Sequence, residues 1–261
     1  MIEDIGNVAH YSRLEHLQKI LKDKYVRLGP VSELNDPRES SLGWIDTCGY
    51  GHDYNEQEFL EASELKKSVG SSLRLFCASH YCEDDLLSVD ALETKAYGRP
   101  RMWAQYGDNS KGFCVILDKN SFHNEIESQV DNLEHLIAGK VEYIDWLSIV
   151  GGGATIEYGK GIPSSKNRIF EIINSNQMLK SQYFKKSIDW GGEKEFRWLM
   201  YSESKQDTLV PIQNSIKAVV LGWKFPPERY SEVKAYCADL GCSCFILNYQ
   251  HPTYKLMQLA K

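Results

Sequence analysis

Short runs of apolar or alternating residues along the chain predict β-strands, because a half-buried strand alternates its faces and a fully buried one is almost continuously apolar. Turn-forming residues separate many of these runs. Asn35-Asp36-Pro37 is a strong turn signal, since Asn and Asp bond the local backbone and Pro fixes φ. Strands are expected at residues 8–11, 25–28, 73–79, 113–117, 140–144, 196–201, 216–221 and 244–247, the last of these being the final strand.

Apolar residues spaced three and four apart predict helices between these strands. Leu14, Leu17 and Ile20 share one helical face, and Ser12 stands where an N-cap is expected. Further helices are expected at residues 55–69 (ending at Gly70), 102–106 (ending at Gly107), 165–187, and from Pro226 to about Leu240. Residues 41–54 and 83–100 are expected to form loops.

The order of these elements is rich in strands but does not alternate regularly between strand and helix. The chain shows no internal repeat, low-complexity tract or long linker. We therefore predict a single α+β domain over residues 1–261, with helices inserted between strands. Residues 202–261 either belong to the same fold or form a C-terminal extension that caps it, and the pattern leaves this open.

The composition and net charge predict the cellular compartment of the protein and restrict the partners that it binds. No apolar run approaches the roughly 20 residues that span a bilayer, and the acidic start MIEDIGNVAH lacks the features of an export signal. Together with seven scattered cysteines, this predicts a cytosolic protein with reduced thiols and no membrane contact. A net charge of −6 argues against strong non-specific phosphate binding. One stretch is locally basic and forms either a solvated helix face or a groove: Lys160, Lys166, Arg168, Lys180, Lys185 and Lys186.

The run from Glu193 to Trp198 is the first candidate for chemistry. On a strand, Glu193, Glu195 and Arg197 would line one face, while Phe196 and Trp198 would bury on the other. Two carboxylates beside a guanidinium suit acid–base or cation-stabilising work, and Arg197 would lower the pKa of Glu195. The alternative is an exposed face with a surface ion pair, which contributes little.

Two further groups carry weaker signals. His10-Tyr11-Ser12 lies at a strand-to-helix junction, where a scaffold can hold functional side chains, although a core histidine is the simpler interpretation. Trp103 and Tyr106 are three apart on the predicted helix, so they either stack on a flat heterocycle or join the core.

Several common motifs are missing from the chain. It contains no GxGxxG, no GxxxxGK[ST] and no HExxH. Cys237, Cys242 and Cys244 lack the spaced second ligand pair of a zinc site. Cys77 and His80 lack an evident third group to orient them as a nucleophile and base.

Five segments in order resemble a large bacterial family of unknown function that overlaps with abortive phage-resistance proteins of the AbiGi type. They are HYSRLEHLQKIL, ELNDPRES, LFCASH, MWAQYGDNSKGFCV and EKEFRWLM, and they cover the chain from about Val8 to Met200. A weaker resemblance is to ADP-ribosyltransferases, including the DarT-like toxins that modify nucleic acids. There His10-Tyr11-Ser12 matches the N-terminal His-x-Ser/Thr element, and Glu195 is the best match for the catalytic glutamate, with Glu193 second.

The second resemblance implies an ADP-ribosyltransferase-like split β-sheet with inserted helices, which clasps NAD between its halves. His10 would bond a ribose hydroxyl, Ser12 the nicotinamide amide or the adjoining ribose, and Glu195 would stabilise an oxocarbenium-like transition state. Tyr106 or Trp103 would stack on the nicotinamide, and Arg27, Arg38 or Arg197 would meet the pyrophosphate. The implied catalytic set is Glu195, Glu193 and Tyr106, and the implied NAD-binding set is His10, Tyr11, Ser12, Arg27, Asn35, Trp103 and Arg197. No tyrosine stands clearly where the family's H-Y-E pattern would place one.

The expected function is an NAD-dependent ADP-ribosyltransferase, a toxin or phage-defence effector that an antitoxin protein restrains. The acceptor is nucleic acid (RNA or DNA) or protein: the resemblance to DarT favours nucleic acid, and the negative net charge mildly disfavours it. Two alternatives stay open: a non-catalytic sensor or antitoxin-like binding module, and a metal-dependent nuclease. The nuclease would use Asp36, Glu39, Glu193 and Glu195.

Overall fold

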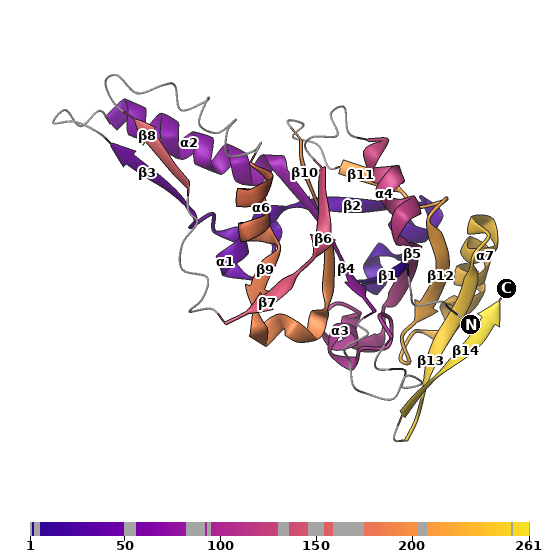
Figure 1. Ribbon diagram of the computed structural model, residues 1–261. Helices are drawn as coiled ribbons and strands as arrows, with labels where there is room; N and C mark the ends of the chain where they lie inside the picture. Colours follow the sequence, from indigo (N-terminus) through magenta and orange to yellow (C-terminus); the bar gives the residue numbers. More distant parts are fainter. Residues whose placement is uncertain are drawn as a thin grey trace.

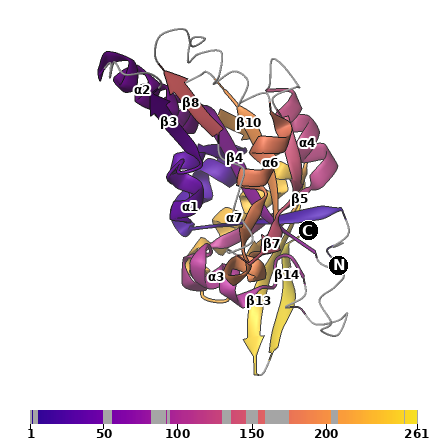
Figure 2. The same cartoon turned by 60° about the vertical axis from the view of Figure 1, so that its left-hand side comes forward.

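A computed structural model gives the protein a mixed α/β architecture built around one ten-stranded mixed sheet (Figure 1). The structure describes residues 2, 6–49, 56–81, 92, 95–129, 136–145, 154–158, 175–202, 208–251 and 253–260. Two small parallel two-stranded sheets stand beside the large one. Both views place α2 with β3 and β8 at one end of the molecule and the β13–β14 hairpin at the other (Figures 1 and 2).

Eight strands of the large sheet follow one path, and two more branch from it. The path is β11 (Thr208–Pro211), β2 (Tyr25–Pro30), β4 (Leu73–His80), β1 (Asn7–Ser12), β5 (Phe113–Asp118), β12 (Ile216–Leu221), β13 (Ser243–Gln250) and β14 (Thr253–Ala260). The branch consists of β10 (Glu195–Tyr201), which pairs with β4, and β6 (Leu136–Lys140), which pairs with β10. The small sheets pair β3 (Ile45–Gly49) with β8 (Ala154–Tyr158), and β7 (Glu142–Ile144) with β9 (Lys185–Ser187).

The large sheet forks at β4. One edge of β4 pairs with β10 along the strand, from Leu73 to Ser79. On the other edge, Ser79 and His80 pair with β1 while Arg74 and Leu75 pair with β2. Strands β1 and β2 therefore part at the middle of β4 and leave the backbone around Cys77 without a strand partner on that side.

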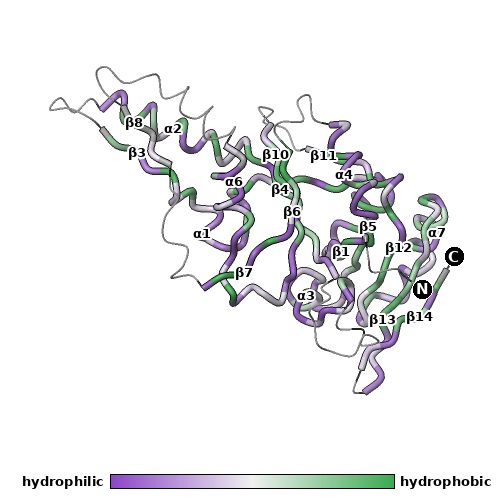
Figure 3. The backbone as a smooth tube through the Cα atoms, in the orientation of Figure 1, coloured by the Kyte–Doolittle hydropathy of each residue, from purple (hydrophilic) through white to green (hydrophobic). Residues whose placement is uncertain are grey.

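Helices cover both faces of the sheet. They are α1 (Pro37–Ser40), α2 (Glu56–Ser72), α3 (Pro100–Gln105), α4 (Lys119–Glu127), α6 (Asn176–Tyr183) and α7 (Tyr230–Leu240). One core cluster joins α4, α7 and the π-helical stretch Gln18–Lys22 to one face of the central strands. The opposite face carries two clusters, one beneath α3 and one beneath α2 and α6. The apolar residues concentrate in the central strands, as Figure 3 shows, because burial of apolar surface drives their assembly.

Most predicted strands are confirmed, because long apolar runs decide them. The strands predicted at 8–11, 25–28, 73–79, 113–117, 196–201 and 216–221 all lie within observed strands. The prediction that 244–247 is the final strand is wrong, since β14 follows β13. Residues 41–54 are not all loop, because β3 lies among them. The strand predicted at 140–144 is interrupted at Val141, between β6 and β7.

Other local predictions fail where tertiary contacts override local preference. The helix predicted to end at Gly70 runs on to Ser72, and Gly70 is needed for packing because an added Cβ would lie 2.6 Å from Leu42 Cδ1. The long helix predicted at 165–187 is wrong at its end, where Lys185–Ser187 form β9, and its residues 165–174 lie outside the described part of the chain. Ser12 is the last residue of β1 and not an N-cap.

The C-terminal residues are built into the same sheet. Strand β12 lies between β5 and β13, and β11 pairs with β2. Val210, Val219 and Leu221 are buried in the largest core cluster. Within the described ranges, no helix has both the length and the apolar character needed to cross a bilayer.

Candidate functional site

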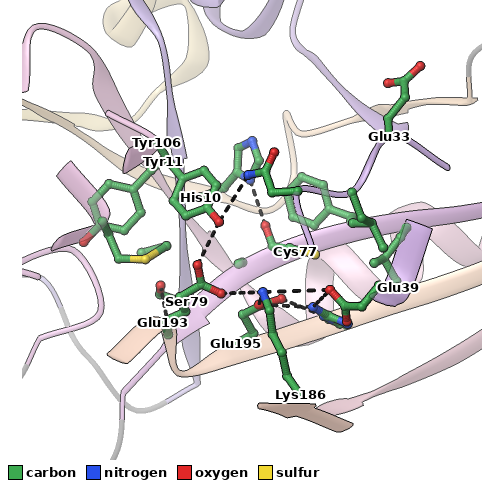
Figure 4. Close-up of a pocket in the computed structure, with 18 of the residues that line it drawn as sticks. His10, Tyr11, Glu33, Glu39, Cys77, Ser79, Tyr106, Lys186, Glu193 and Glu195 are labelled. Atoms are coloured by element: carbon green, nitrogen blue, oxygen red, sulfur yellow. Dashed lines mark hydrogen bonds and ion pairs between the residues drawn. The ribbon is translucent and has the colours of Figure 1, made fainter. Parts of the chain in front are cut away.

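A cavity of about 230 Å³ opens at the fork of the sheet (Figure 4). Strands β1, β2, β4, β9 and β10 contribute to its walls, as do the segment around α1 and the end of α3. Its polar and charged lining residues are His10, Tyr11, Arg27, Glu33, Asn35, Glu39, Cys77, Ser79, Tyr106, Lys186, Glu193, Glu195 and Arg197. The cavity thus gathers residues that lie far apart in the sequence, from Ala9 to Arg197.

Five buried charged residues form one wall, and we name them the charge cluster: Glu39, Lys186, Glu193, Glu195 and Arg197. The Lys186 ammonium donates to Glu193 Oε2 at 2.6 Å and to Glu195 Oε1 at 2.7 Å. Arg197 donates from Nε to Glu195 Oε2 at 2.6 Å and pairs through its other nitrogens with Glu39. Buried charges are stable only when paired and hydrogen-bonded in this way.

Local structure places each member of the cluster. Glu195 and Arg197 alternate on β10, so both point to the cavity face, opposite Ser79 and Cys77 of β4. The face is buried, which rules out the exposed-face interpretation of this run. Glu193 precedes the strand, at the end of the 3-10 turn Ile188–Glu193.

The turn between Glu193 and β10 has its own supports. Lys194 takes a left-handed conformation with φ 47°, which redirects the chain into the strand. Ser79 Oγ donates to the Glu193 carbonyl at 2.8 Å, and the His80 amide donates to that of Lys194. Glu193 was predicted to share the strand face. It reaches the same wall by way of this turn.

The remaining members come from α1 and β9. Asp36 caps α1 by accepting the Arg38 amide, and Pro37 begins the helix, so Glu39 projects toward Arg197. On β9, Lys186 is buried and faces the cavity. Arg197 is fixed further by donating to the Tyr183 carbonyl at 2.6 Å.

The two carboxyl groups of the cluster have opposite pKa shifts. Burial and the neighbouring Glu195 raise the pKa of Glu193 to about 7, against the opposing effect of Lys186. Burial alone would also raise the pKa of Glu195, but Arg197, Glu193 and Lys186 together hold it well below its usual range. Paired carboxyl groups with separated pKa values are the usual arrangement for one fixed charge and one proton carrier.

Tyr106 joins Glu193 to the open part of the cavity. Its hydroxyl donates to Glu193 Oε1 at 2.7 Å and accepts from Asn35 Nδ2 at 3.4 Å. Burial and the Glu193 charge raise the pKa of Tyr106, so it stays a neutral donor. Gly107 permits this placement, because a Cβ there would lie 2.6 Å from the Trp103 ring.

His10 fills the fork itself. Its Nδ1 lies 2.9 Å from the carbonyl oxygen of Cys77, in the stretch of β4 that neither β1 nor β2 covers. Its ring stacks on Phe76 with centroids 4.5 Å apart. Burial lowers the pKa of His10, so the imidazole is neutral near pH 7; with Nδ1–H donating to the carbonyl, Nε2 is an acceptor.

Two of the predicted NAD-binding residues lie away from the cavity. Trp103 is buried in the core cluster beneath α3 and donates to the Tyr97 carbonyl at 2.9 Å. Ser12 is buried with its Oγ 3.3 Å from His16 Nδ1. Trp103 was placed by its spacing from Tyr106, and its side chain packs into the core; Ser12 was placed by the His-x-Ser resemblance, and it ends β1, beyond the residues of that strand that line the cavity.

The other predicted residues line the cavity, with different degrees of freedom. Tyr11 has its hydroxyl bound to the Ala96 carbonyl. Arg27 is exposed and pairs with Glu33 at 2.8 Å. Arg197 is fully buried in its ion pairs, so it is a structural partner of Glu195 and not an open anion site. Asn35 lines the cavity and donates from Nδ2 to the Tyr106 hydroxyl.

The geometry is less suited to a metal-dependent nuclease or to a cysteine nucleophile. Glu39, Glu193 and Glu195 already share Lys186 and Arg197 as counter-ions, and Asp36 caps α1 instead. The described residues contain no cluster suited to a metal ion. Burial raises the pKa of Cys77, which disfavours the thiolate that a nucleophile needs. His80 Nδ1 lies 2.6 Å from the Tyr81 carbonyl oxygen.

Sequence reasoning missed Lys186 as a site residue and assigned Glu39 only to the nuclease alternative. Lys186 fell inside a predicted helix and was counted with a basic surface stretch, so no signal marked it as buried. Tyr143 was also missed, although its hydroxyl accepts the Glu195 amide at 2.9 Å. Pairing of β7 with β9 brings Tyr143 beside Lys186, and that contact exists only in three dimensions.

Comparison with known proteins gives one similarity. Residues 102–198 match the model of a family described as protein of unknown function (DUF2971). The matched segment includes Tyr106 and four members of the charge cluster, namely Lys186, Glu193, Glu195 and Arg197, but not His10. No curated protein and no solved structure matches the chain.

Proposed function

We propose that the cavity transfers ADP-ribose from NAD to an acceptor. The observation that carries the proposal is that His10, Tyr106 and the carboxyl pair Glu193 and Glu195 line one cavity at a fork in the sheet. A neutral imidazole, a phenol and two carboxyl groups of separated pKa form a set that can bind a ribose and handle one proton. The fork between β1 and β2 also fits the split sheet that the ADP-ribosyltransferase resemblance implies.

The reaction balances without an oxidant or reductant. The bond between C1′ of the nicotinamide ribose and the pyridinium nitrogen breaks, and nicotinamide leaves as a neutral molecule with the bonding electrons. C1′ passes through an oxocarbenium-like state and bonds to the acceptor nucleophile. The acceptor's proton goes to a carboxylate of the site.

Glu193 suits the proton-handling role better than Glu195. Its pKa of about 7 lets it accept a proton near neutral pH, and its Oε1 contacts Tyr106 in the open part of the cavity. Glu195 is fixed by Arg197 and Lys186 and supplies a constant negative charge near the developing cation. The resemblance to ADP-ribosyltransferases favoured Glu195 as the catalytic glutamate. With the roles divided in this way, both glutamates take part in the mechanism.

The size of the cavity limits how NAD would bind. About 230 Å³ is below the 300–1,000 Å³ typical of pockets that enclose a whole drug-sized ligand, so only the nicotinamide ribose half would enter. His10 Nε2 would accept from a ribose hydroxyl, and Tyr106 would lie against the nicotinamide. Arg27, which is exposed and pairs with Glu33, would exchange that partner for the pyrophosphate.

The biological setting follows from the resemblance and is part of the proposal. An effector that consumes NAD and modifies nucleic acid or protein would act in the cytosol as a toxin or phage-defence protein. Such an activity harms its own cell, so an antitoxin protein would bind and restrain it.

The direct test incubates the purified protein with NAD labelled in the adenylate phosphate and with cell extract. Label that enters macromolecules and resists removal by free-nucleotide washing supports transfer, and separate nuclease and protease digestion identifies the acceptor. Glu193→Gln and His10→Ala should each abolish transfer, and Glu64→Gln on the exposed surface of α2 should not. Absence of both label transfer and nicotinamide release from folded protein would overturn the proposal.

A further variant separates the two carboxylates. Glu195→Gln removes the negative charge that Arg197 and Lys186 share, so circular dichroism and thermal unfolding must first establish that the variant folds. If folded Glu195→Gln transfers more slowly but keeps the pH dependence of transfer near neutral pH, and Glu193→Gln loses it, Glu193 is the proton-handling group. The reverse result would return that role to Glu195.

A further inference from the structure

Three cysteines gather where α7 ends and β13 begins, namely Cys237, Cys242 and Cys244. All three are free thiols and are buried in the largest core cluster, and none of them lines the cavity. Figure 1 shows α7 beside β12 and β13, the strands against which it packs. Whatever chemistry these thiols have is therefore independent of the proposed function.

The end of α7 fixes the spacing of Cys237 and Cys242. Gly241 takes a left-handed conformation with φ 66°, and the Cys242 amide donates to the Cys237 carbonyl at 2.9 Å. This helix ending turns the chain back, so the residue after the glycine packs its side chain against the last turn of the helix. A disulfide needs Cα atoms about 4.4–6.8 Å apart, a spacing to which a hydrogen-bonded turn of this kind is suited.

Hydrogen bonds join the three thiols. The Cys237 thiol bonds to those of Cys242 and Cys244. These two bonds, together with burial, raise the pKa of Cys237, and donation by Cys237 lowers the pKa of Cys242 and that of Cys244. Cys237 therefore stays protonated, while its two neighbours gain thiolate character, which is the form of cysteine that reacts.

Exposure separates the two acceptors of this hydrogen bonding. Cys242 is 6% exposed, whereas Cys244 is 0% exposed. A thiolate is oxidised only where a reagent reaches it, so a small oxidant meets Cys242 first. Cys237 is then the neighbour that can displace the oxidised product, because its backbone is bonded to that of Cys242.

A metal ion is the other partner to consider for three thiols, since thiolates bind zinc and copper(I). Among the residues that the structure describes, no group of three or more His, Cys, Asp or Glu is arranged to hold one. The hydrogen bonds also keep Cys237 protonated, whereas a metal requires thiolate ligands. The cluster is therefore better suited to oxidation than to metal binding.

We propose that Cys242 and Cys237 form a reversible dithiol that a peroxide oxidises to a disulfide. The Cys242 thiolate attacks hydrogen peroxide: an S–O bond forms, the O–O bond breaks, and hydroxide leaves and takes up the proton that Cys242 released. The Cys237 sulfur then attacks this sulfenic acid: an S–S bond forms, and the second hydroxide leaves as water with the Cys237 proton.

The reaction is balanced and can be reversed. The two thiols lose two electrons and two protons, and one hydrogen peroxide becomes two waters. The disulfide crosslinks the last turn of α7 to the residue that precedes β13. A small reduced thiol restores both cysteines by thiol–disulfide exchange.

Mapping of the disulfide in the whole protein is the first test. The folded protein is treated with hydrogen peroxide, the remaining thiols are alkylated in denaturant, and the chain is cleaved before Asp239 without reduction. This cleavage separates Cys237 from Cys242 and Cys244. We expect the two fragments to stay joined, tandem mass spectrometry to place the bond between Cys237 and Cys242, and dithiothreitol to release it.

Trapping of the sulfenic acid with dimedone tests the two roles. In Cys237→Ala the oxidised Cys242 has no thiol to displace it, so dimedone should label Cys242 about tenfold more than in the wild type. Cys237→Ser keeps a hydrogen-bond donor and should give the same label, which provides a second variant if the alanine variant does not fold. Cys114→Ala is the matched control, because it removes a buried thiol from β5 and should behave as the wild type.

Several results would overturn the proposal. One is complete alkylation of Cys237 and Cys242 after a peroxide treatment that oxidises the exposed Cys48. Another is a disulfide of the folded wild type that joins Cys244 to either of the other two. A third is the absence of dimedone label on Cys242 in both folded Cys237 variants, because that would mean that Cys242 is not the thiol that meets the peroxide.

Discussion

Replacing Glu193 by glutamine should stabilise the protein at alkaline pH and have a much smaller effect at acidic pH. The folded protein disfavours the ionised form of this buried carboxyl group, whose pKa rises from the ordinary 4.5 to about 7. A group whose pKa is raised by folding contributes stability that is fully present below its unfolded pKa. That stability is lost as the pH rises through the folded pKa. Glutamine has no proton to lose, so the variant escapes this loss.

The magnitude follows from the two pKa values. Each pKa unit corresponds to about 1.4 kcal/mol, so a rise from 4.5 to about 7 amounts to about 3 kcal/mol in full. Between about pH 5 and about pH 8, the wild type should lose about 2.5 kcal/mol relative to Glu193→Gln. For a protein of this size that difference corresponds to a melting-temperature change of about 5–10 °C.

Urea unfolding of both proteins at the two pH values measures the difference directly. Glu64→Gln is the control, because Glu64 is exposed on α2 and its replacement should change the free energy of unfolding by the same amount at both pH values. A Glu193→Gln variant with the same stability relative to the wild type at both pH values would refute the reasoning. It would mean that Glu193 is ionised throughout and that Lys186 fully offsets its burial.

Three further predictions test the packing and the network of the site. Lys186→Met leaves Glu193 and Glu195 without their shared counter-ion and should cost about 3–5 kcal/mol in urea unfolding; a loss below about 1 kcal/mol would contradict a tight pair. Gly112→Ala places a Cβ on the Ser12 carbonyl oxygen and should lower stability by about 2–3 kcal/mol, whereas Gly191→Ala, with 3.8 Å to its nearest neighbour, should be nearly neutral. Tyr106→Phe removes the hydroxyl that donates to the Glu193 carboxylate, and loss of that hydrogen bond raises the pKa of Glu193. The pH midpoint of nicotinamide release should therefore move up by about 1 pH unit. An unchanged midpoint would argue against Glu193 as the proton-handling group.

The candidate site could be anticipated in part, because a strand's alternation is a local property. Glu195 and Arg197 were expected on one face of a strand, and they share that face in β10. Their burial was not foreseen, since it depends on Glu39 and Lys186, which arrive from α1 and β9. Strand β9 has three residues, too few for a periodic pattern, and a helix was predicted there instead.

His10 illustrates the same limit at the other end of the site. Its position near the end of a strand was evident from the apolar run before it, but a core histidine was the simpler interpretation. The fork in which His10 lies is created by β4, which pairs with β1 at one end and with β2 at the other. Ser12 and Trp103 stand close to site residues in sequence and still turn into the core.

The sequence by itself determined the mixed helix-and-strand character, the longer strands and the residue types available for chemistry, because apolar periodicity and side-chain chemistry are local. Only the tertiary structure decided which of these residues meet, which carboxyl group has a raised pKa, and which lysine faces the cavity. Those outcomes depend on contacts between segments far apart in the chain. The electrostatic effect of such contacts grows as water is excluded, and burial is a property of the assembled fold.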